Sequence, residues 1–303
     1  MVISGKYLFN NIQAAKSGAF LSVQLCSKFL LLTLLFLISI SAKSQVVVHP
    51  GEDGEEYYAR LLKHVVTYSK DKNYQVKAFG TYIPKDRDFE LLLNSDGIDV
   101  VFAGSTKERE QKYLPIRFPL LGGLNGWRIP LVQKGREDLF QNITTLEQFK
   151  QLKPGQFHTW SDTKVLLTNN IEVVKGSDYE GLFGMLALGR FDYFPRSVLE
   201  IDREYAAHSD LAIAIESSVI IHYPTAYYFY VSKENQSLAR DLKYGLELAL
   251  QDGSLAKIFN HFYGDSIKRV RGTHRRVIEL DNPLLPKETP LNRAELWINL
   301  GQK

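Results

Sequence analysis

The segment Ile98–Arg109, IDVVFAGSTKER, joins a short apolar run to a polar loop and a run of charged residues. Ile98–Phe102 predicts a buried strand, because apolar residues dominate a run of strand length. The strand runs out into the loop Ala103–Thr106. In open α/β sheets ligands bind just beyond the carboxyl ends of strands. We therefore expect a binding site at this loop.

The chain around this segment alternates between strand and helix patterns. From Gln45 onward, short apolar runs alternate with helical periodicity, which is typical of βα units and largely parallel sheets. Two extended segments, residues 127–132 and 220–231, interrupt the alternation. They predict an α/β fold of two lobes, with two mixed, mostly parallel sheets joined by a two-stranded hinge. The expected first lobe comprises residues 46–128 and 229–264, and the second comprises residues 133–222.

The last part of the chain departs from this pattern. Residues 265–303 contain a cluster of basic residues followed by spaced prolines and leucines. Proline cannot continue a helix and favours extended backbone. We expect this part to form an extended tail that wraps a lobe.

The first part of the chain is typical of a leader. Phe29–Ile40 is an apolar run that follows Lys28 and precedes a small-x-small site at Ala42–Ser44. The run is short for a transmembrane helix, which needs about 20 apolar residues. The pattern predicts a cleavable secretory signal over residues 1–44 and a periplasmic protein. An uncleaved anchor or a buried helix is the alternative.

Composition narrows the class of protein. The 303 residues are 45% apolar, with 37 Lys and Arg against 34 Asp and Glu, which excludes a disordered chain and a disulfide scaffold. The predicted leader holds four lysines and no acidic residue, so the remainder has a formal net charge of −1. A nucleic-acid partner is therefore not expected. The single cysteine, Cys26, also lies in the leader, so the remainder must be stabilised by its core.

Several short motifs follow one another in the order found in one family. Thr106-x-x-Arg109 followed by Tyr113–Leu120 is similar to the family pattern T-x-x-R … F-S-x-P-Y. The further similar motifs are Gly189–Asp192 (GRxD), the return strand Tyr228–Lys233, and the terminal helix pair with Asp252–Ile258. Over roughly residues 46–264 the chain resembles the type II periplasmic solute-binding proteins of family 3, the amino-acid-binding extracellular components of ABC transporters.

The resemblance implies a small-molecule ligand held between two lobes that close about a hinge, and a membrane permease of an ABC transporter as partner. In that family the Arg of T-x-x-R binds the ligand's carboxylate, and Arg109 occupies that position. A guanidinium binds a carboxylate through two hydrogen bonds and keeps its charge in a dry cleft. The alternative is a solvated arginine within the charged run that begins at Lys107.

A second group of candidate residues opens a helix in the second lobe. Ser161, Asp162 and Thr163 are expected at a helix start that faces the cleft, where free N–H groups and hydroxyls hold an anion. A role in capping the helix is the alternative, and the two roles are compatible.

Two positions depart from the family pattern. Ser197 stands where amino-acid binders usually place an Asp for the ligand's ammonium, and Arg196 precedes it. Gly104 stands where a Ser hydroxyl is common. We therefore expect an acidic ligand without an amine. The predicted ligand-binding residues are Gly104, Thr106, Arg109, Ser161, Asp162, Thr163, Arg196 and Ser197.

Other functions leave weaker signals. The chain lacks the H-E-x-x-H, G-x-S-x-G, CxxC and Gly-rich phosphate-loop motifs, and its seven His residues do not fall at metal-ligand spacing. We expect no enzymatic activity, metal or cofactor, and a monomer. One alternative is a dehydratase-like enzyme with Glu200 or Asp162 as general acid. The other is a periplasmic ligand-binding partner of a membrane sensor, such as a receptor or kinase.

Overall fold

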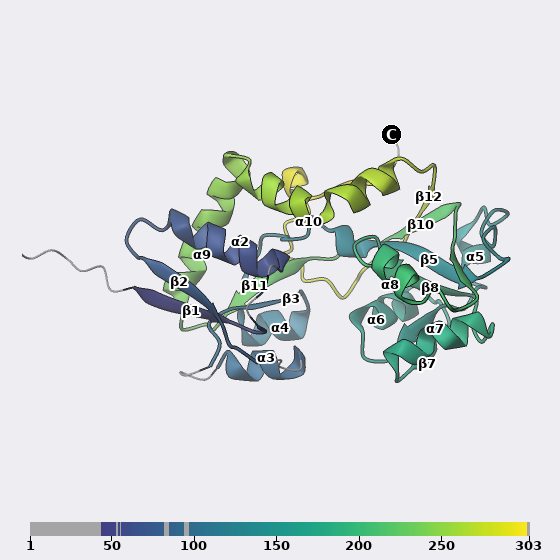
Figure 1. The fold of residues 1–303 in the computed structure, drawn as a ribbon, viewed down its shortest axis with the longest axis horizontal. Coiled ribbons are helices and arrows are strands. Elements are labelled where there is room, and N and C mark those ends of the chain that lie inside the picture. Colours follow the sequence, from purple (N-terminus) through teal and green to yellow (C-terminus); the bar gives the residue numbers. More distant parts are fainter. Residues whose placement is uncertain (1–43, 53, 55, 82–84, 94–96, 302–303) are drawn as a thin grey trace, which may run out of the picture. The chain divides into compact units, whose positions relative to one another are not determined.

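The computed structural model describes residues 44–301, except residues 53, 55, 82–84 and 94–96. Residues 1–43, which hold most of the predicted secretory signal, lie outside the described residues. Within the described part of the chain, no helix is long and apolar enough to cross a membrane. Figure 1 shows the helices and strands of this part, coloured along the sequence.

Lobe 1 is built on a three-stranded sheet whose central strand comes from late in the chain. Strand β11 (Tyr227–Val231) lies between β3 (Val101–Gly104) and β4 (Leu114–Ile116) and is antiparallel to both. A separate parallel pair joins β1 (Gln45–His49) to β2 (Tyr74–Ala78). The helices of this lobe are α2 (Tyr57–Val65), with the 3-10 turn η1 (Val66–Tyr68), α3 (Lys85–Leu91), α4 (Lys107–Lys112), α9 (Gln236–Gln251) and α10 (Ser254–Arg271).

Lobe 2 is built on a five-stranded sheet. The strand order is β12 (Arg276–Glu279), β10 (Val219–His222), β5 (Trp127–Gln133) and β8 (Tyr193–Ser197), and β9 (Ile213–Ile215) also pairs with β5. A small parallel pair joins β6 (Gly155–Phe157) to β7 (Val174–Gly176). The helices of this lobe are α5 (Leu146–Phe149), α6 (Ser161–Thr168), α7 (Tyr179–Ala187) and α8 (Ile201–Ala207). Two 3-10 turns lie elsewhere in the chain: η2 (Leu124–Gly126) precedes β5, and η3 (Ala294–Leu296) lies near the C-terminus.

The α/β class with mixed sheets is confirmed, but the balance of strand directions differs from the expectation. Among the described residues five strand pairs are antiparallel and three are parallel. The reason is that the two crossing strands, β5 and β11, enter their sheets against the direction of their neighbours. Strands predicted to be neighbours in βα repeats are therefore separated in the sheet by a strand that enters from the other lobe.

The two crossing segments lie side by side where they leave one lobe for the other. Trp127 of β5 is paired with His222 of β10 in antiparallel register, and the Tyr223 amide donates to the Gly126 carbonyl at 3.1 Å. A Cβ on Gly126 would lie 2.0 Å from the Tyr223 carbonyl oxygen, so only glycine allows this approach. The expected two-stranded hinge therefore has a physical basis in this contact.

The apolar core supports the predicted binding loop from below. Phe89, Tyr113 and Tyr230 belong to one cluster of buried residues in lobe 1. The Phe89 ring lies 4.7 Å from Tyr113 and 5.5 Å from Tyr230, measured between ring centroids. These rings hold α3, α4 and β11 together. The loop between β3 and α4 is thereby placed on a packed base.

The C-terminal tail begins later than expected. Helix α10 continues to Arg271, past Gly264, because Ile267 and Val270 extend its buried face. A glycine within a helix costs about 1 kcal/mol, which such burial offsets. The tail that follows is not only extended backbone, since residues Arg276–Glu279 form β12.

Candidate functional site

Arg109 is presented by the first turn of α4. Thr106 caps this helix, because its side-chain oxygen accepts the Arg109 amide at 3.2 Å. The Arg109 guanidinium donates from Nη1 to the Gly104 carbonyl at 2.7 Å and lies over the Phe89 ring, 5.2 Å from its centroid. The structure thus brings together three predicted site residues, Gly104, Thr106 and Arg109, at the loop where the sequence predicts a site.

The charge of Arg109 has no counter-ion within the described part of the chain. No described carboxylate lies within ion-pair distance of its guanidinium, and the neighbouring Glu110 is bound by Arg117 and by the Ser105 hydroxyl. The side chain is half-buried, and among the described residues its guanidinium donates only from Nη1. An aromatic base and a fixed carbonyl hold the guanidinium in place while leaving donors for a ligand anion.

A second charged group lies at the hinge and the start of α6. The Arg128 guanidinium on β5 contacts the Asp162 carboxylate, which also accepts the Tyr223 hydroxyl at 2.5 Å. Arg128 is 5% exposed, and Nη1 lies 4.0 Å from a Glu200 carboxylate oxygen. Burial opposes the charged form of Arg128, but Asp162, Tyr223 and Glu200 outweigh it and raise its pKa. Its Nε has no hydrogen-bond partner among the described residues.

Tyr227 connects the two charged groups. Its ring packs on Gly104, where an added Cβ would lie 3.4 Å from Tyr227 Cε2. Burial raises the pKa of Tyr227 to about 12; Asp162 also raises it, whereas Arg128 and Arg109 lower it. The phenol is therefore within electrostatic range of both arginines. We call Gly104, Arg109, Arg128, Asp162 and Tyr227 the arginine site.

The start of α4 is also close to α6 of lobe 2. The pKa of Glu108 is lowered first by its own backbone N–H, then by the Thr106 side chain, and further by Lys164 and Lys107. Lys164 belongs to α6, so the two helices that carry predicted site residues lie within electrostatic range of each other.

The three predicted site residues at the start of α6 differ in their contacts and exposure. Asp162 belongs to the arginine site. Thr163 is buried and its hydroxyl donates to the Phe157 carbonyl at 2.8 Å, which fastens α6 to β6. Ser161 is exposed. None of the three caps the helix, since the N-cap residue is Trp160, which makes no side-chain capping bond.

Arg196 is engaged within lobe 2. Its Nε and Nη2 each donate to a Glu204 carboxylate oxygen at 2.6 Å, and Nη2 also donates to Glu200 at 3.2 Å. The guanidinium lies 4.8 Å from the Trp160 ring and 4.6 Å from the Phe194 ring. Its charge is thus balanced without a ligand. The role predicted for Arg196 in ligand binding stays a prediction, and these contacts favour a structural role.

Ser197 is fully buried at the end of β8. Its exposed fraction is 0%, and its Oγ accepts the Leu199 amide at 3.2 Å. The hydroxyl therefore shapes the turn that leads into α8. Its predicted role in ligand binding also remains untested.

Glu200 is the carboxylate that connects Arg196 to Arg128. Its side chain is 36% exposed and lies 3.2 Å from one guanidinium and 4.0 Å from the other. The group in lobe 2 thus contains two arginines and three carboxylates, those of Asp162, Glu200 and Glu204. Its formal charge is −1, opposite to that of Arg109.

Two residues of the arginine site, Arg128 and Tyr227, and the adjoining Glu200 were not predicted from sequence as ligand-binding residues. Arg128 lies in the apolar crossing segment, where its neighbours predict core. Tyr227 lies in an aromatic run, residues 227–230, in which residue type does not separate core rings from rings of a site. Glu200 entered only as an acid for catalysis. The one available signal was the occurrence of a charged residue, Arg128, in an otherwise apolar segment.

Comparison with known proteins defines the fold. No protein-family model and no curated protein matches the chain. It is similar to the solved structure of a probable amino-acid ABC transporter extracellular-binding protein from Bacillus subtilis, with 20% identity and a TM-score of 0.53 over 74% of this chain and 99% of that one. It is also similar to the solved structure of an arginine transport system periplasmic binding protein from Legionella pneumophila. The two are 12% identical, with a TM-score of 0.52 over 73% of this chain and 100% of that one.

A third solved structure, described with glutathione import in Streptococcus mutans, is 16% identical with a TM-score of 0.53, over 73% of this chain and 95% of that one. Each of these proteins is covered almost completely. The chain therefore has the two-lobed α/β fold of type II periplasmic binding proteins. The predicted fold class is confirmed.

Proposed function

We propose that the protein is a periplasmic solute-binding protein that captures a small polar, carboxylate-bearing ligand by hinge closure, for an ABC-type transporter. The observation that carries the proposal is Arg109, a charged side chain held over Phe89 without a counter-ion among the described residues. It follows strand β3, the place where this class of fold binds ligands. The similar solved structures, which are described as binding proteins, support the proposal.

The mechanism follows from the division of charge between the lobes. Arg109 donates to the Gly104 carbonyl and the Tyr227 ring packs on Gly104, so Tyr227 is the neighbour of a carboxylate bound by Arg109, and Asp162 and Arg128 lie on the side of lobe 2. Contacts to both lobes exist only when the lobes are close together. A ligand that binds the closed state better shifts the population toward it by that difference in affinity.

The charge of lobe 2 bears on whether the ligand has an amine. Ser197 is buried, yet Glu200 is partly exposed and belongs to a group with a formal charge of −1. Glu200 thus supplies a carboxylate that the spacing from Gly189 did not reveal. We propose that Arg109 recognises a carboxylate whether or not the ligand also has an amine. Comparing each carboxylate with its α-amino analogue tests for recognition of the amine.

The first prediction concerns Arg109. After a thermal-shift screen of monocarboxylates, dicarboxylates and amino acids finds a ligand, Arg109→Ala is expected to weaken its binding roughly 100-fold, as measured by calorimetry. The reason is the loss of two charge-assisted hydrogen bonds in a partly dry site. Lys112→Ala on the same helix, an exposed cation, is the control and is expected to bind normally.

Two outcomes contradict this prediction or refine it. Equal binding by the Arg109→Ala variant, at an unchanged melting temperature, identifies Arg109 as a surface residue. For the amine, each carboxylate is compared with its α-amino analogue. If the α-amino analogue binds more tightly and this gain is lost in Glu200→Gln, Glu200 is the ammonium partner. The expectation of a ligand without an amine is then wrong.

A further inference from the structure

Residues 276–300, which we call the strap, form a connection between the lobes in addition to the two crossing segments and the link from α10 to β12. In lobe 2 the strap begins as β12, which pairs in parallel with β10 from Val219–Arg276 to His222–Glu279. It continues along α6, where the Asn169 side chain donates to the Asp281 carbonyl at 2.7 Å and accepts its amide at 3.0 Å. This end of the strap is therefore part of the lobe 2 sheet.

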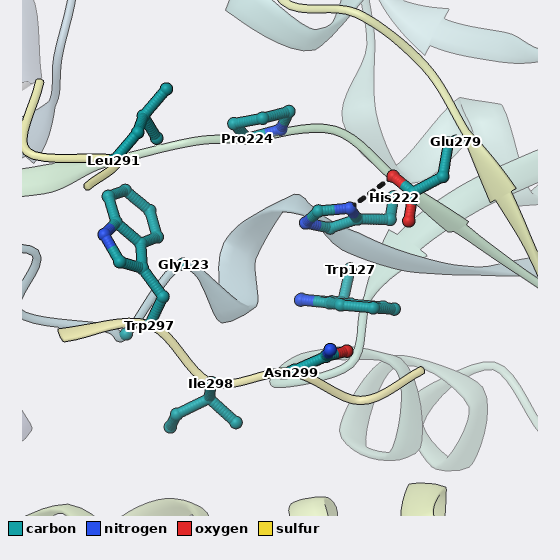
Figure 2. Close-up of a pocket in the computed structure, with 10 residues that line it drawn as sticks. Gly123, Trp127, His222, Pro224, Glu279, Leu291, Trp297, Ile298 and Asn299 are labelled. Carbon is teal, nitrogen blue, oxygen red and sulfur yellow. Dashed lines mark hydrogen bonds and ion pairs between the residues drawn. The ribbon is translucent and has the colours of Figure 1, made fainter. Parts of the chain in front are cut away.

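At the hinge the strap makes apolar and polar contacts, and Leu280 is buried in the cluster that contains Ile221 and Tyr223. Glu279 lies 2.6 Å from His222 Nδ1, and the Asn282 amide donates to the Pro224 carbonyl at 2.8 Å. Figure 2 shows the space between the hinge and the strap, with the Trp127 and His222 rings stacked 4.0 Å apart on one side and Trp297 on the other. This cavity measures about 260 Å³. The strap is thus held to the hinge by the packing of Leu280 and by a few polar contacts.

In lobe 1 the strap is attached to α4 and to α9. Lys107 Nζ donates to the Pro283 carbonyl at 3.0 Å, on the helix that presents Arg109. Farther along, the Arg293 guanidinium donates to both carboxylate oxygens of Glu247, at 2.6 and 2.9 Å. The bidentate geometry is that of the stronger class of ion pair.

The last contact of the strap is with two glycines that precede β5. Gly122 and Gly123 have φ of +54° and +74°, which favour glycine. A Cβ on Gly122 would lie 2.9 Å from Ile298 Cδ1, and a Cβ on Gly123 would lie 2.6 Å from Trp297 Cε3. The Ile298 amide donates to the Gly122 carbonyl at 2.8 Å. The glycines thus allow the strap to approach the chain of lobe 1.

We propose that the strap limits the amplitude of hinge motion. It joins β10 in lobe 2 to α9 in lobe 1 through a segment stiffened by Pro283, Pro286 and Pro290, so relative rotation of the lobes must break an anchor. The latch comprises the two outermost anchors, Arg293 on Glu247 and Trp297 on Gly123. This restraint acts with or without a ligand and goes beyond the solute-binding role.

The test measures the distance between the lobes. The described part of the chain has no cysteine, so in a full-length Cys26→Ser background nitroxide labels are attached at Lys63→Cys on α2 and Lys175→Cys on β7, both exposed. Double electron–electron resonance without ligand is expected to give one narrow distance distribution. Arg293→Ala/Trp297→Ala is expected to broaden it and to add a second population, whereas Lys287→Ala, an exposed strap cation, leaves it unchanged.

Two results overturn the proposal. One is a broad or two-population distribution in the Cys26→Ser background. The other is an unchanged narrow distribution in the double variant, with its folding confirmed by circular dichroism. If the double variant does not fold, Arg293→Gln alone replaces it with the same criteria. Because no ligand is added, failure here is distinct from failure of the calorimetric test of Arg109.

Discussion

Replacing Arg196 with alanine is expected to lower the free energy of unfolding by about 3–5 kcal/mol, because it leaves a buried carboxylate without its counter-ion. Glu204 is 7% exposed on its side chain, and both of its oxygens accept hydrogen bonds from Arg196. The Tyr179 hydroxyl donates to the same carboxylate at 2.6 Å. Urea denaturation followed by circular dichroism measures the loss.

Two controls separate the ion pair from general effects. Arg190→Ala removes an exposed arginine of lobe 2 and is expected to change stability by less than about 0.5 kcal/mol. The double variant Arg196→Met/Glu204→Leu removes both charges and is expected to recover most of the loss. If Arg196→Ala instead keeps full stability and loses ligand binding, the role predicted from sequence is correct and the structural role is wrong.

The same pair predicts how stability depends on pH. Burial by itself raises the pKa of Glu204, but Arg196 and Tyr179 outweigh it and lower the pKa below its usual value. A carboxyl with a lowered folded-state pKa stabilises the fold above its unfolded pKa of about 4.3. This contribution is lost as the pH falls through the folded-state pKa. The acid side of the stability curve is therefore expected to flatten in Arg196→Ala.

Replacing Gly245 with alanine is expected to destabilise the protein by about 3 kcal/mol through overpacking. Gly245 lies on the buried face of α9, against α2, and an added Cβ would lie 2.1 Å from the Val65 carbonyl oxygen. The obstacle is backbone, which cannot rotate away as a side chain can. Thermal and urea denaturation both report the change.

Gly184 is the matched control for this prediction, since it also lies within a helix, α7. An added Cβ there has no atom within 4 Å. Gly184→Ala is expected to stabilise the fold by up to about 1 kcal/mol, because alanine has the higher helix propensity. Opposite signs for the two variants support close packing of α9 on α2, and similar effects contradict it.

Local patterns were enough to predict the order of elements. Threonine favours the N-cap position of helices, and Thr145 caps α5 in a capping box with Gln148. The strand before the loop Ala103–Thr106 and the two crossing segments were also expected. The direction of pairing was less predictable, because β11 enters a sheet formed mainly by residues more than a hundred positions earlier.

The site was predicted only in part, because charge balance depends on distant partners. Arg109 could be placed from its position after a strand and from the family motif. The partners of the two other arginines could not be found this way. Arg128 meets Asp162, 34 positions later, and Arg196 on β8 meets Glu204 on α8, 8 positions later. A sequence shows that a charge exists, but not whether a carboxylate neutralises it.

By itself, the sequence determined the α/β class, the two halves with their crossings, and the loop that carries Arg109, since each follows from periodicity and residue type over a short span. Only the tertiary structure decided which of Arg109, Arg128 and Arg196 has no counter-ion among the described residues, and that the C-terminal strap connects both lobes. These depend on contacts between residues far apart in the chain, such as Arg293 with Glu247 and Trp297 with Gly123. Packing of the whole fold sets those contacts, and no local pattern specifies them.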